Sequence, residues 1–311
     1  MERTAVLPIA DLFAEHRRFL WGLSYRMLGS AADADDVVQD TFVRALEHPP
    51  QRTDEPVRPW LVKVALNLSR DHLRRRRRRD YVGPWLPSPI DTGEESSPPS
   101  HEPAVDGART LEGRYDLLES VSFAFLLALE ALTPTQRAVL LLRDVFDYSV
   151  KETADALDLT ESNVKTSHHR ARNAMDEYER RRLIPTSEVQ EAARTALVTF
   201  MRKLRDHDVS GIEAMLADDV KTTTDGGGEF RAALRTIVGR DKVTRFYLAV
   251  AETNVLVRPL QVNGMPALVF DVPVPHEHQA PRYVVTAAMD RDGKISAIYV
   301  VSATRKLSAI K

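Results

Sequence analysis

The sequence predicts a multidomain protein with two all-α helical domains followed by a C-terminal α+β cone domain. Apolar residues recur at helical spacing near the N-terminus and again after a segment rich in proline, serine and acidic residues. Beyond residue 186, an amphipathic helix is followed by short apolar segments that are typical of strands. A chain of 311 residues has room for these parts. We place them at 8–80, at 111–184 and at 187–311, with a linker at 81–110.

The composition limits the classes of function. With 43% hydrophobic residues, 28% charged residues and a net charge of -2, the chain is typical of a globular protein. No apolar stretch reaches the length of about 18 residues needed to span a bilayer, and the N-terminus lacks the pattern of a signal peptide. We therefore expect a cytoplasmic protein with no membrane partner. The absence of cysteine excludes disulfides and thiolate zinc sites, and we expect no cofactor and no metal ion.

Three amphipathic helices are predicted within the first domain. A proline-containing loop over 47–59 separates the second from the third, which runs directly into six consecutive arginines, Arg74 to Arg79. By itself such a run is most simply a solvated face. Because charge is screened beyond about 8 Å at physiological salt, the run could also bind a polyanion although the net charge of the chain is small.

Two helices joined by a tight turn are predicted in the stretch SVKETADALDLTESNVKTSHHRARNAMDEY. Ser149 and Glu152 form a capping box for the first helix, and Thr160 can cap the second. A similar box, Thr133 with Gln136, precedes the apolar run AVLLL, which indicates a buried helix.

Apolar residues at Ala154, Leu159 and Val164 would let these two helices cross closely, as in a helix-turn-helix. An ordinary helical hairpin with a solvated face is the alternative. In a helix-turn-helix the second helix enters the major groove of DNA. The side chains expected to face DNA are Ser162, Asn163, Lys165, Thr166, His169, Arg170 and Arg172. His168 and His169 lack partners at the four-residue spacing of a helical metal pair, so we expect no metal there.

Three motifs together resemble a known family. They are ADDVVQDTFVRAL at 34–46, RPWLVKVALNLSRDHLRRRRR at 58–78, and the helix-turn-helix. Residues 10–80 resemble region 2, and residues 115–180 resemble region 4, of bacterial extracytoplasmic-function (group IV) RNA polymerase sigma factors.

The resemblance implies partners and site residues. Asp36, Gln39 and Asp40 would contact the clamp helices of the largest subunit of core RNA polymerase. The second predicted helix of the helix-turn-helix would read the −35 element of promoter DNA. The residues implied near the melted −10 element are Trp60, Asn67, Arg70, Asp71, Arg74 and Arg75.

The chemistry of these residues agrees with promoter opening. Unstacking bases costs a few kcal/mol, so the protein needs polar groups for base edges and cations for the backbone. Asn67, Arg70 and Asp71 lie on adjacent turns of one predicted helix and can supply both, and the arginines beyond extend the cationic track. Trp60 could equally belong to the hydrophobic core.

The segment YVGPWLPSPI at 81–90 resembles a signature that follows region 2 in sigma factors with an extra C-terminal domain. Ser88 stands where that signature usually has glutamate. A proline-spaced segment is extended and preorganised. We therefore expect Trp85, Leu86 and Pro87 to anchor the linker on the C-terminal domain.

The C-terminal domain resembles the SnoaL-like members of the nuclear-transport-factor fold. A capping box of Ser187 with Gln190 predicts its first helix, and a strand over VKTTTD leads into DGGGE. This last motif, which resembles a signature of the sigma-fused subgroup, contains Asp225, Gly226, Gly227 and Gly228. A short helix is expected near 210–216, before this strand. A helix over 240–250 and strands over 254–262, 267–274, 282–290 and 295–302 follow the motif, with a hairpin turn at RDGK. The final SATRKL departs from the subgroup's Asn-Pro-Asp-Lys-Leu.

We expect a sigma factor whose fused C-terminal domain modulates its activity, without enzymatic activity. Pockets of this fold can hold acids and bases, for which Asp225, His207 and Asp206 are the candidates, but Asp225 and its glycines could simply form a turn. The alternative is a DNA-tethered receptor or enzyme whose cone binds or converts a small-molecule ligand. A separate anti-sigma protein is not required by the sequence.

Overall fold

The computed structural model describes residues 9–49, 56–76, 81–93, 115–251 and 255–311, and it divides into two compact units. The first unit comprises Met1–Arg79, Pro98–Leu117 and Leu129–Asp176. The second comprises Asp80–Ser97, Leu118–Ala128 and Glu177–Lys311. Among the described residues, no helix is both long enough and apolar enough to cross a membrane.

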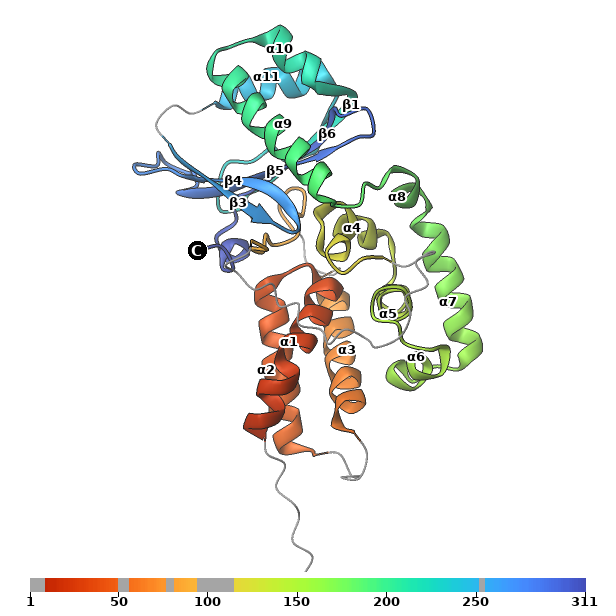
Figure 1. Cartoon of the computed structure of the whole chain (residues 1–311). Coiled ribbons are helices and arrows are strands. Elements are labelled where there is room, and N and C mark those ends of the chain that lie inside the picture. Colours follow the sequence, from red (N-terminus) through yellow and green to blue (C-terminus); the bar gives the residue numbers. More distant parts are fainter. Residues whose placement is uncertain (1–8, 50–55, 77–80, 94–114, 252–254) are drawn as a thin grey trace, which may run out of the picture. The chain divides into compact units, whose positions relative to one another are not determined.

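A three-helix bundle begins the first unit. Its helices are α1 (Ile9–Leu28), α2 (Ala31–Glu47) and α3 (Val57–Arg76). Gly29 turns the chain with a φ of 64°, and Ser30 then caps α2 by accepting a hydrogen bond from the backbone N–H of Asp33. Leu23 and Leu66 are among the fully buried side chains. The predicted bundle is confirmed, and Figure 1 shows its helices side by side.

The rest of the first unit is built around the helix-turn-helix. Its elements are α5 (Pro134–Leu140), the π-helical turn η3 (Leu141–Val145), α6 (Val150–Leu157) and α7 (Glu161–Ala174). The predicted caps form at Thr133 with Gln136, at Ser149 with Glu152 and at Thr160. Asp158 ends α6 in the left-handed conformation, with a φ of 53°, and redirects the chain into α7. The helix-turn-helix geometry is confirmed.

Between Tyr115 and α5 the chain does not form one continuous helix, and residues 94–114 lie outside the described residues. The chain there forms η1 (Glu119–Val121), α4 (Phe123–Ala128) and η2 (Leu129–Ala131). Ser122 is extended, with φ -61° and ψ 149°, and its hydroxyl accepts the backbone N–H of Phe125. A serine that caps α4 in this way interrupts a continuous helix.

The second unit is an α+β domain with one six-stranded sheet. Its strands are β1 (Leu216–Asp225), β2 (Ile237–Val238), β3 (Leu256–Val262), β4 (Met265–Asp271), β5 (Arg282–Met289) and β6 (Ile295–Val301). The strand order is β2-β1-β6-β5-β4-β3, in which β1 pairs parallel with β6 and the other pairs are antiparallel. The strands expected in the last 60 residues are confirmed, as is the turn at RDGK.

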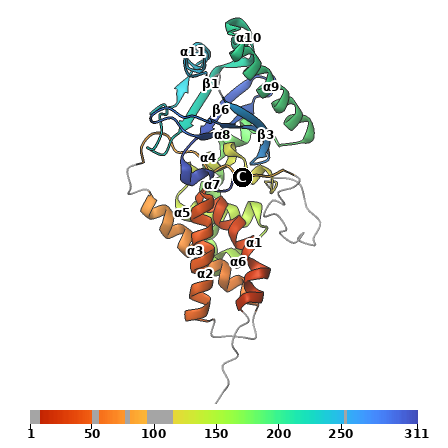
Figure 2. The ribbon, with the colours of Figure 1, turned by 90° about the vertical axis from the view of Figure 1, so that its left-hand side faces the viewer.

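Three helices cover one face of this sheet (Figure 2). They are α9 (Ser187–Arg205), α10 (Val209–Met215) and α11 (Arg240–Val250). Phe200 of α9 and Tyr247 of α11 pack edge to face with ring centroids 5.5 Å apart, above Phe270 of the sheet. These side chains fill the space between the helices and the sheet.

The cap predicted for α9 is wrong by one residue. Thr186, not Ser187, accepts the backbone N–H of Val189, because Ser187 is already the first helical residue. Gln190 therefore does not close a capping box, and its amide donates to the carbonyl of Gly264 at 2.9 Å.

Segments from distant parts of the chain cover the opposite face of the sheet. Leu86 of the linker, Phe123 of α4 and Leu307 of η4 (Thr304–Leu307) pack there with Val269 of β4. Phe123 stacks on Tyr299 with centroids 5.5 Å apart. A sheet that is covered on both faces explains why β4 is apolar at consecutive positions.

Candidate nucleic-acid interface and linker anchor

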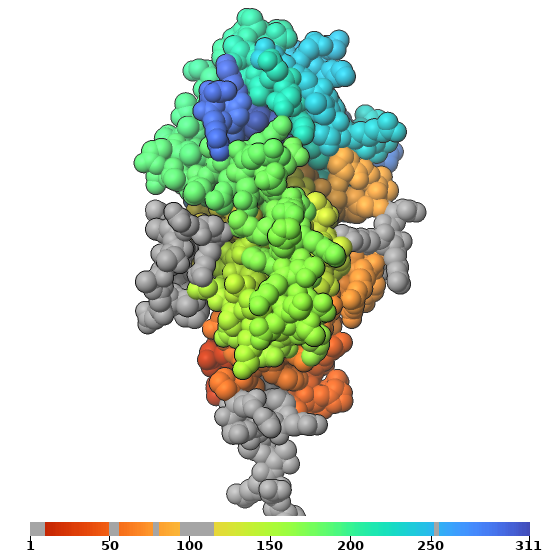
Figure 3. Space-filling view, turned by 90° about the vertical axis from the view of Figure 1, so that its right-hand side faces the viewer, coloured from red at the N-terminus to blue at the C-terminus, as the bar shows by residue number. Residues whose placement is uncertain are grey.

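Six of the seven residues predicted to face DNA are exposed on α7. This helix belongs to the green part of the chain that faces the viewer in Figure 3. The exposed residues are Ser162, Asn163, Lys165, Thr166, His169 and Arg170. Val164 and Ala171 are fully buried on the inner face and fix the rotation of the helix. Hydroxyl, amide and cationic groups on one exposed helix face can contact both base edges and phosphates.

Arg172, the seventh residue, faces Asp144 of η3 instead. Its guanidinium donates to Asp144 at 3.3 Å and lies 5.9 Å from the ring centroid of Tyr115. His168 also contacts Asp144, at 2.8 Å. Because Asp144 is buried, these contacts fasten α7 to the preceding turn. In the parts of the chain that the structure describes, no cluster of His and acidic side chains could hold a metal ion.

The residues predicted to bind polymerase form one exposed face of α2. Asp36, Gln39 and Asp40 are all exposed, and their spacing places them on adjoining turns. Val43 and Leu46, exposed by 47% and 63%, continue this face toward the end of the helix. Polar and apolar side chains that are exposed together suit a protein partner.

Arg70, one of the predicted −10 residues of α3, lies against the helix-turn-helix part of the same unit. Arg70 donates to Asn67 at 3.5 Å and to the hydroxyl of Thr135, at the start of α5, at 3.3 Å. Burial, and then the nearby Arg74, lower the pKa of Arg70. Lys63 forms an ion pair with Asp158 at 2.5 Å. Two contacts with the helix-turn-helix part therefore hold this side of α3.

The remaining predicted −10 residues have other surroundings. Trp60 is partly exposed, so its ring is neither enclosed in the hydrophobic core nor fully available for stacking on a base. Asp71 accepts a hydrogen bond from Arg74 at 2.8 Å, and Arg75 donates to the backbone of Asp71 at 3.4 Å. Residues 77–79, the last three arginines of the run, lie outside the described residues.

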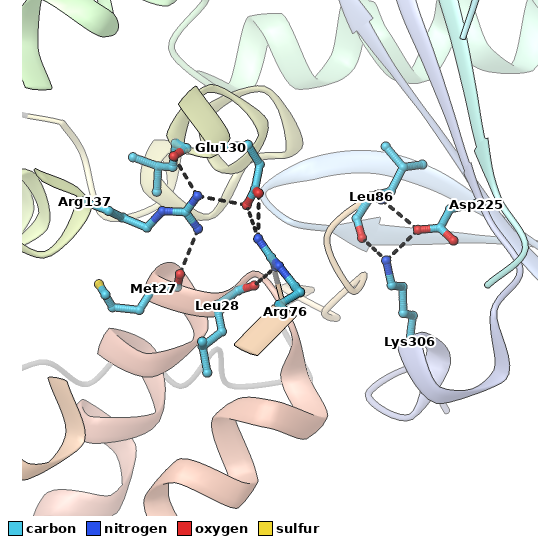
Figure 4. A network of polar contacts seen from close by, with 9 residues as sticks. Met27, Leu28, Arg76, Leu86, Glu130, Arg137, Asp225 and Lys306 are labelled. Atoms are coloured by element: carbon cyan, nitrogen blue, oxygen red, sulfur yellow. Dashed lines mark hydrogen bonds and ion pairs between the residues drawn. The ribbon is translucent and has the colours of Figure 1, made fainter. Parts of the chain in front are cut away.

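A charged cluster, here called the clasp, joins the end of α3 to the helix-turn-helix part (Figure 4). It consists of Arg76, Glu130 and Arg137. Arg76 binds Glu130 at 2.6 Å and the carbonyl of Leu28 at 2.8 Å. Arg137, only 2% exposed, binds Glu130 at 2.9 Å and the carbonyl of Met27 at 2.8 Å. Burial alone would raise the pKa of Glu130, but Arg137 and Arg76 hold it below its ordinary value.

An aromatic contact extends the clasp. Phe146, directly after η3, packs edge to face on Phe19 of α1 with centroids 5.3 Å apart. The guanidinium of Arg26 lies 5.3 Å from the Phe146 ring, and that of Arg58 lies 4.0 Å from the Phe19 ring. The sequence alone did not indicate that the two helical parts pack together, because these residues are far apart in the chain.

A second network, here called the latch, ties the linker to the C-terminal domain. It consists of Leu86, Asp225 and Lys306 (Figure 4). Asp225, 1% exposed, accepts the backbone N–H of Leu86 at 2.7 Å and the Lys306 ammonium at 2.5 Å. It also accepts the hydroxyl of Tyr81 at 2.6 Å. Lys306 donates to the carbonyl of Leu86 and lies 4.5 Å from the Trp85 ring centroid.

The glycines of the DGGGE motif leave room for this contact. A Cβ on Gly226 would lie 2.6 Å from the carbonyl of Phe230, and one on Gly227 would lie 2.7 Å from Ala303. Gly227 and Gly228 also adopt φ values of 62° and 78°. The glycines therefore let the turn place Asp225 against the linker. Of the two roles considered from the sequence, pocket acid or turn residue, the contacts of Asp225 support the turn residue.

The predicted linker residues lie on this anchor. Leu86 is fully buried, and Trp85 and Pro87 flank it. Ser88 is also fully buried, so glutamate at this position would place a carboxylate in the interior. Sequence reasoning missed Lys306, although it is a cation in the apolar C-terminal segment and keeps the Lys-Leu pair of the related signature.

The three candidate acids and bases do not form a catalytic group. Asp225 is engaged by the latch, and Lys306 neutralises its charge. Asp206 and His207 are exposed where α9 ends, with Asp206 paired to Arg205 at 3.3 Å. Among the residues that the structure describes, Asp206 and His207 both contact Arg205, the last residue of α9, and not a buried acid or base.

Comparison with known proteins gives concordant matches. The Sigma-70 region 2 family model matches residues 12–79, and the Sigma-70, region 4 model matches residues 122–175. The chain is 30% identical over 301 residues to the ECF RNA polymerase sigma factor SigJ of Mycobacterium tuberculosis, which covers 93% of this chain and 90% of that protein. It is 36% identical over 172 residues to the ECF RNA polymerase sigma factor SigG of the same species, covering 51% of this chain and 45% of that protein. The crystal structure of Mycobacterium tuberculosis extracytoplasmic function sigma factor SigJ matches with a TM-score of 0.72 and 25% identity, over 96% of this chain and 98% of that chain.

Proposed function

Because the chain belongs to the extracytoplasmic-function family of RNA polymerase sigma factors, we propose a division of labour among its parts. The protein directs promoter recognition and transcription initiation by core RNA polymerase. The three-helix bundle is region 2, and the helix-turn-helix part belongs to region 4. In our proposal α7 reads the −35 element, α3 opens the −10 element, and the exposed face of α2 binds the polymerase clamp helices.

We propose that the arrangement described above is a closed form of low activity. The observation that carries this is the position of Arg70, which is bound to Thr135 of region 4. Lys63 on the same helix is paired with Asp158, and the clasp holds the end of α3. A side chain engaged in this way cannot also contact an unstacked base, so promoter opening requires α3 to leave region 4.

We further propose that the C-terminal domain restrains the factor through the latch and acts without catalysis. The linker that leaves α3 is held from Tyr81 to Leu86 by a buried, fully hydrogen-bonded carboxylate. Tethering gives such a contact a high effective concentration, near millimolar for a flexible linker, so little intrinsic affinity is needed. No separate anti-sigma protein is needed for this restraint.

Transcription from a cognate promoter tests the restraint. The Asp225→Asn/Lys306→Met variant removes the ion pair without leaving one charge buried. Its matched control, Asp241→Asn/Arg245→Met, removes an exposed ion pair of α11 in the same domain. We expect higher activity for the latch variant than for the control and the wild type. Equal activity and equal polymerase affinity in all three would contradict the proposed restraint.

A further inference from the structure

We propose that Asp144 holds Arg172 away from DNA and thereby limits how strongly α7 binds DNA of any sequence. Asp144 lies in the π-helical turn η3 and is 7% exposed, whereas Arg172 lies near the end of α7. Asp144 acts through Arg172 and not on DNA itself, so it is a positioning residue. The proposal rests on the proposed function only in that α7 is taken to bind duplex DNA.

The guanidinium of Arg172 is held by two groups. It donates to Oδ2 of Asp144 at 3.3 Å and lies 5.9 Å from the ring centroid of the buried Tyr115. The backbone N–H of Tyr115 donates to the carbonyl of Asp144 at 3.0 Å, which keeps the ring and the acid close together. His168, one turn before Arg172 on α7, contacts the other carboxylate oxygen at 2.8 Å. Both oxygens of Asp144 therefore contact side chains of α7.

The position of Arg172 on α7 does not by itself keep its side chain from DNA. Successive residues of an α-helix are about 100° apart around the axis, so Arg172, seven positions after Lys165, lies within about 20° of it. Lys165 is exposed on the face proposed to contact DNA, and the Arg172 side chain is still 31% exposed. A long cationic side chain at this edge of the helix can reach a phosphate once Asp144 no longer holds it.

Apolar packing also holds α7, independently of Asp144. Val164 and Ala171 on the inner face, and Met175 directly after the helix, are 0% exposed. Loss of the Asp144 charge should therefore release the side chain of Arg172 without releasing the helix. Asparagine at 144 keeps the volume and one acceptor oxygen, but it has only one carbonyl oxygen to offer and carries no charge to hold a guanidinium.

A released Arg172 adds one cation to the surface that faces DNA. Phosphate contacts strengthen binding to every duplex, because the backbone carries no base sequence. Base pairs are instead distinguished by polar groups such as those of Ser162, Asn163 and Thr166, which are exposed on α7. By holding a nearby cation, Asp144 leaves a larger share of the binding to these groups and weakens binding to the many non-promoter sites of a genome.

The salt dependence of binding to a short labelled duplex of random sequence tests this restraint. Fluorescence anisotropy with the full chain gives the affinity at each salt concentration, and the slope of log affinity against log salt changes by about 0.9 per phosphate contact. We expect Asp144→Asn to make this slope steeper by about 0.9. Arg172→Met should leave the wild-type slope unchanged, because the protein already holds the guanidinium. Asp144→Asn/Arg172→Met should also keep the wild-type slope, because no cation is left to release.

Two further variants separate the restraint from other effects of losing a charge. Asp155→Asn, on the exposed side of α6, changes the net charge by the same amount, and we expect no change in slope. Asp144→Ser removes the buried charge with a smaller side chain and should reproduce the steeper slope. Thermal unfolding identifies any variant that has lost its fold. If neither Asp144 variant folds, Arg172→Met still decides, because a shallower slope would show that Arg172 already contacts phosphate.

Wild-type slopes in both folded Asp144 variants would overturn the proposal, as would a shallower slope in Arg172→Met or a steeper one in the double variant. Lys165→Met/Arg170→Met tests the proposed function separately and should make the slope shallower, because two exposed cations are lost. An unchanged slope in that variant would contradict DNA binding by α7 and the restraint with it. A shallower slope there, with wild-type slopes in the Asp144 variants, would overturn the restraint alone.

Discussion

The two helices proposed to read the promoter are presented very differently. On α7, Lys165 and Arg170 are exposed together with their polar neighbours. On α3, Arg70 is held by Thr135 and Lys63 by Asp158. Both helices carry polar and cationic residues at helical spacing, so their sequences alone would suggest equal access to DNA. The difference arises because region 4 packs its inner surface, and not α7, against α3.

This difference implies an order of events. In the proposed closed form, α7 can contact duplex −35 DNA before α3 is available to the −10 element. Release of α3 then requires the clasp to open, and this opening is favoured when polymerase binds the separated regions more tightly than the closed form. Our proposal therefore treats recognition and melting as separate steps carried out by one chain.

The largest expected effect concerns the latch, which holds the linker directly beyond α3. Lys306→Met leaves the fully buried Asp225 carboxylate without its cation, and breaking such a pair costs about 3 to 5 kcal/mol. Denaturant unfolding followed in the second unit should show this loss. The Asp225→Asn/Lys306→Met variant should recover most of it, and equal stability of the single and double variants would contradict the assigned ion pair.

A smaller effect is expected for α7 itself. Changing Lys165 or Arg170 to Ala should weaken binding to a −35 duplex by about 1 to 3 kcal/mol if the side chain contacts a base. Binding of a single-stranded −10 oligonucleotide should not change. Fluorescence anisotropy at fixed salt measures both affinities, with exposed Arg245→Ala as a control for loss of charge. Intact −35 binding combined with lost melting would reverse the roles assigned to the two helices.

The exposed face of α2 should affect polymerase binding without affecting the fold. Replacing Asp36, Gln39 and Asp40 with alanine should weaken the complex with core polymerase, whereas each change should alter the stability of region 2 by under about 0.5 kcal/mol. Affinity chromatography with core polymerase, together with thermal unfolding, measures the two quantities. Unaltered polymerase binding by a folded triple variant would remove this face from the interface.

The pH dependence of the clasp is expected to be the most modest effect. Arg137 and Arg76 hold the pKa of Glu130 below its ordinary value, so ionised Glu130 stabilises the closed form above that value. This stabilisation should be lost as the pH falls below 4.5, the ordinary pKa of glutamate, and through the lower pKa that Glu130 has in the closed form. The distance between labels attached at Glu47→Cys on α2 and at Asn173→Cys on α7 should therefore lengthen on acidification, and Glu130→Gln should remove this dependence. If the Glu130→Gln protein showed the same lengthening on acidification, groups other than Glu130 would be responsible for it.

Much of the fold could be predicted from local sequence patterns. The capping boxes at Ser149 and Thr133 set helix starts correctly because their hydrogen bonds span only three residues. The expected cap at Ser187 failed because Thr186, immediately before it, offers the same hydroxyl. Local patterns therefore identify helices more reliably than their first residues.

The sites depend on contacts that local patterns do not contain. The exposed residues of α7 could be identified because the buried Val164 fixes which side faces out. Arg172 does not belong to this exposed set, because its guanidinium donates a hydrogen bond to Asp144, 28 positions earlier in the sequence. Lys306 was missed because its partner Leu86 lies more than 100 positions away in the sequence.

The affinity of the polymerase-free protein for a single-stranded −10 oligonucleotide tests the central claim most directly. Glu130→Gln/Asp158→Asn removes two region 4 charges that hold α3, without changing any proposed DNA-reading residue, and asparagine suits the left-handed backbone at 158. We expect this variant to bind the −10 oligonucleotide several-fold more tightly than the wild type, with equal affinity for the −35 duplex. Equal −10 affinity in the two proteins would show that region 4 does not cover the reading face of α3 and would contradict the closed form.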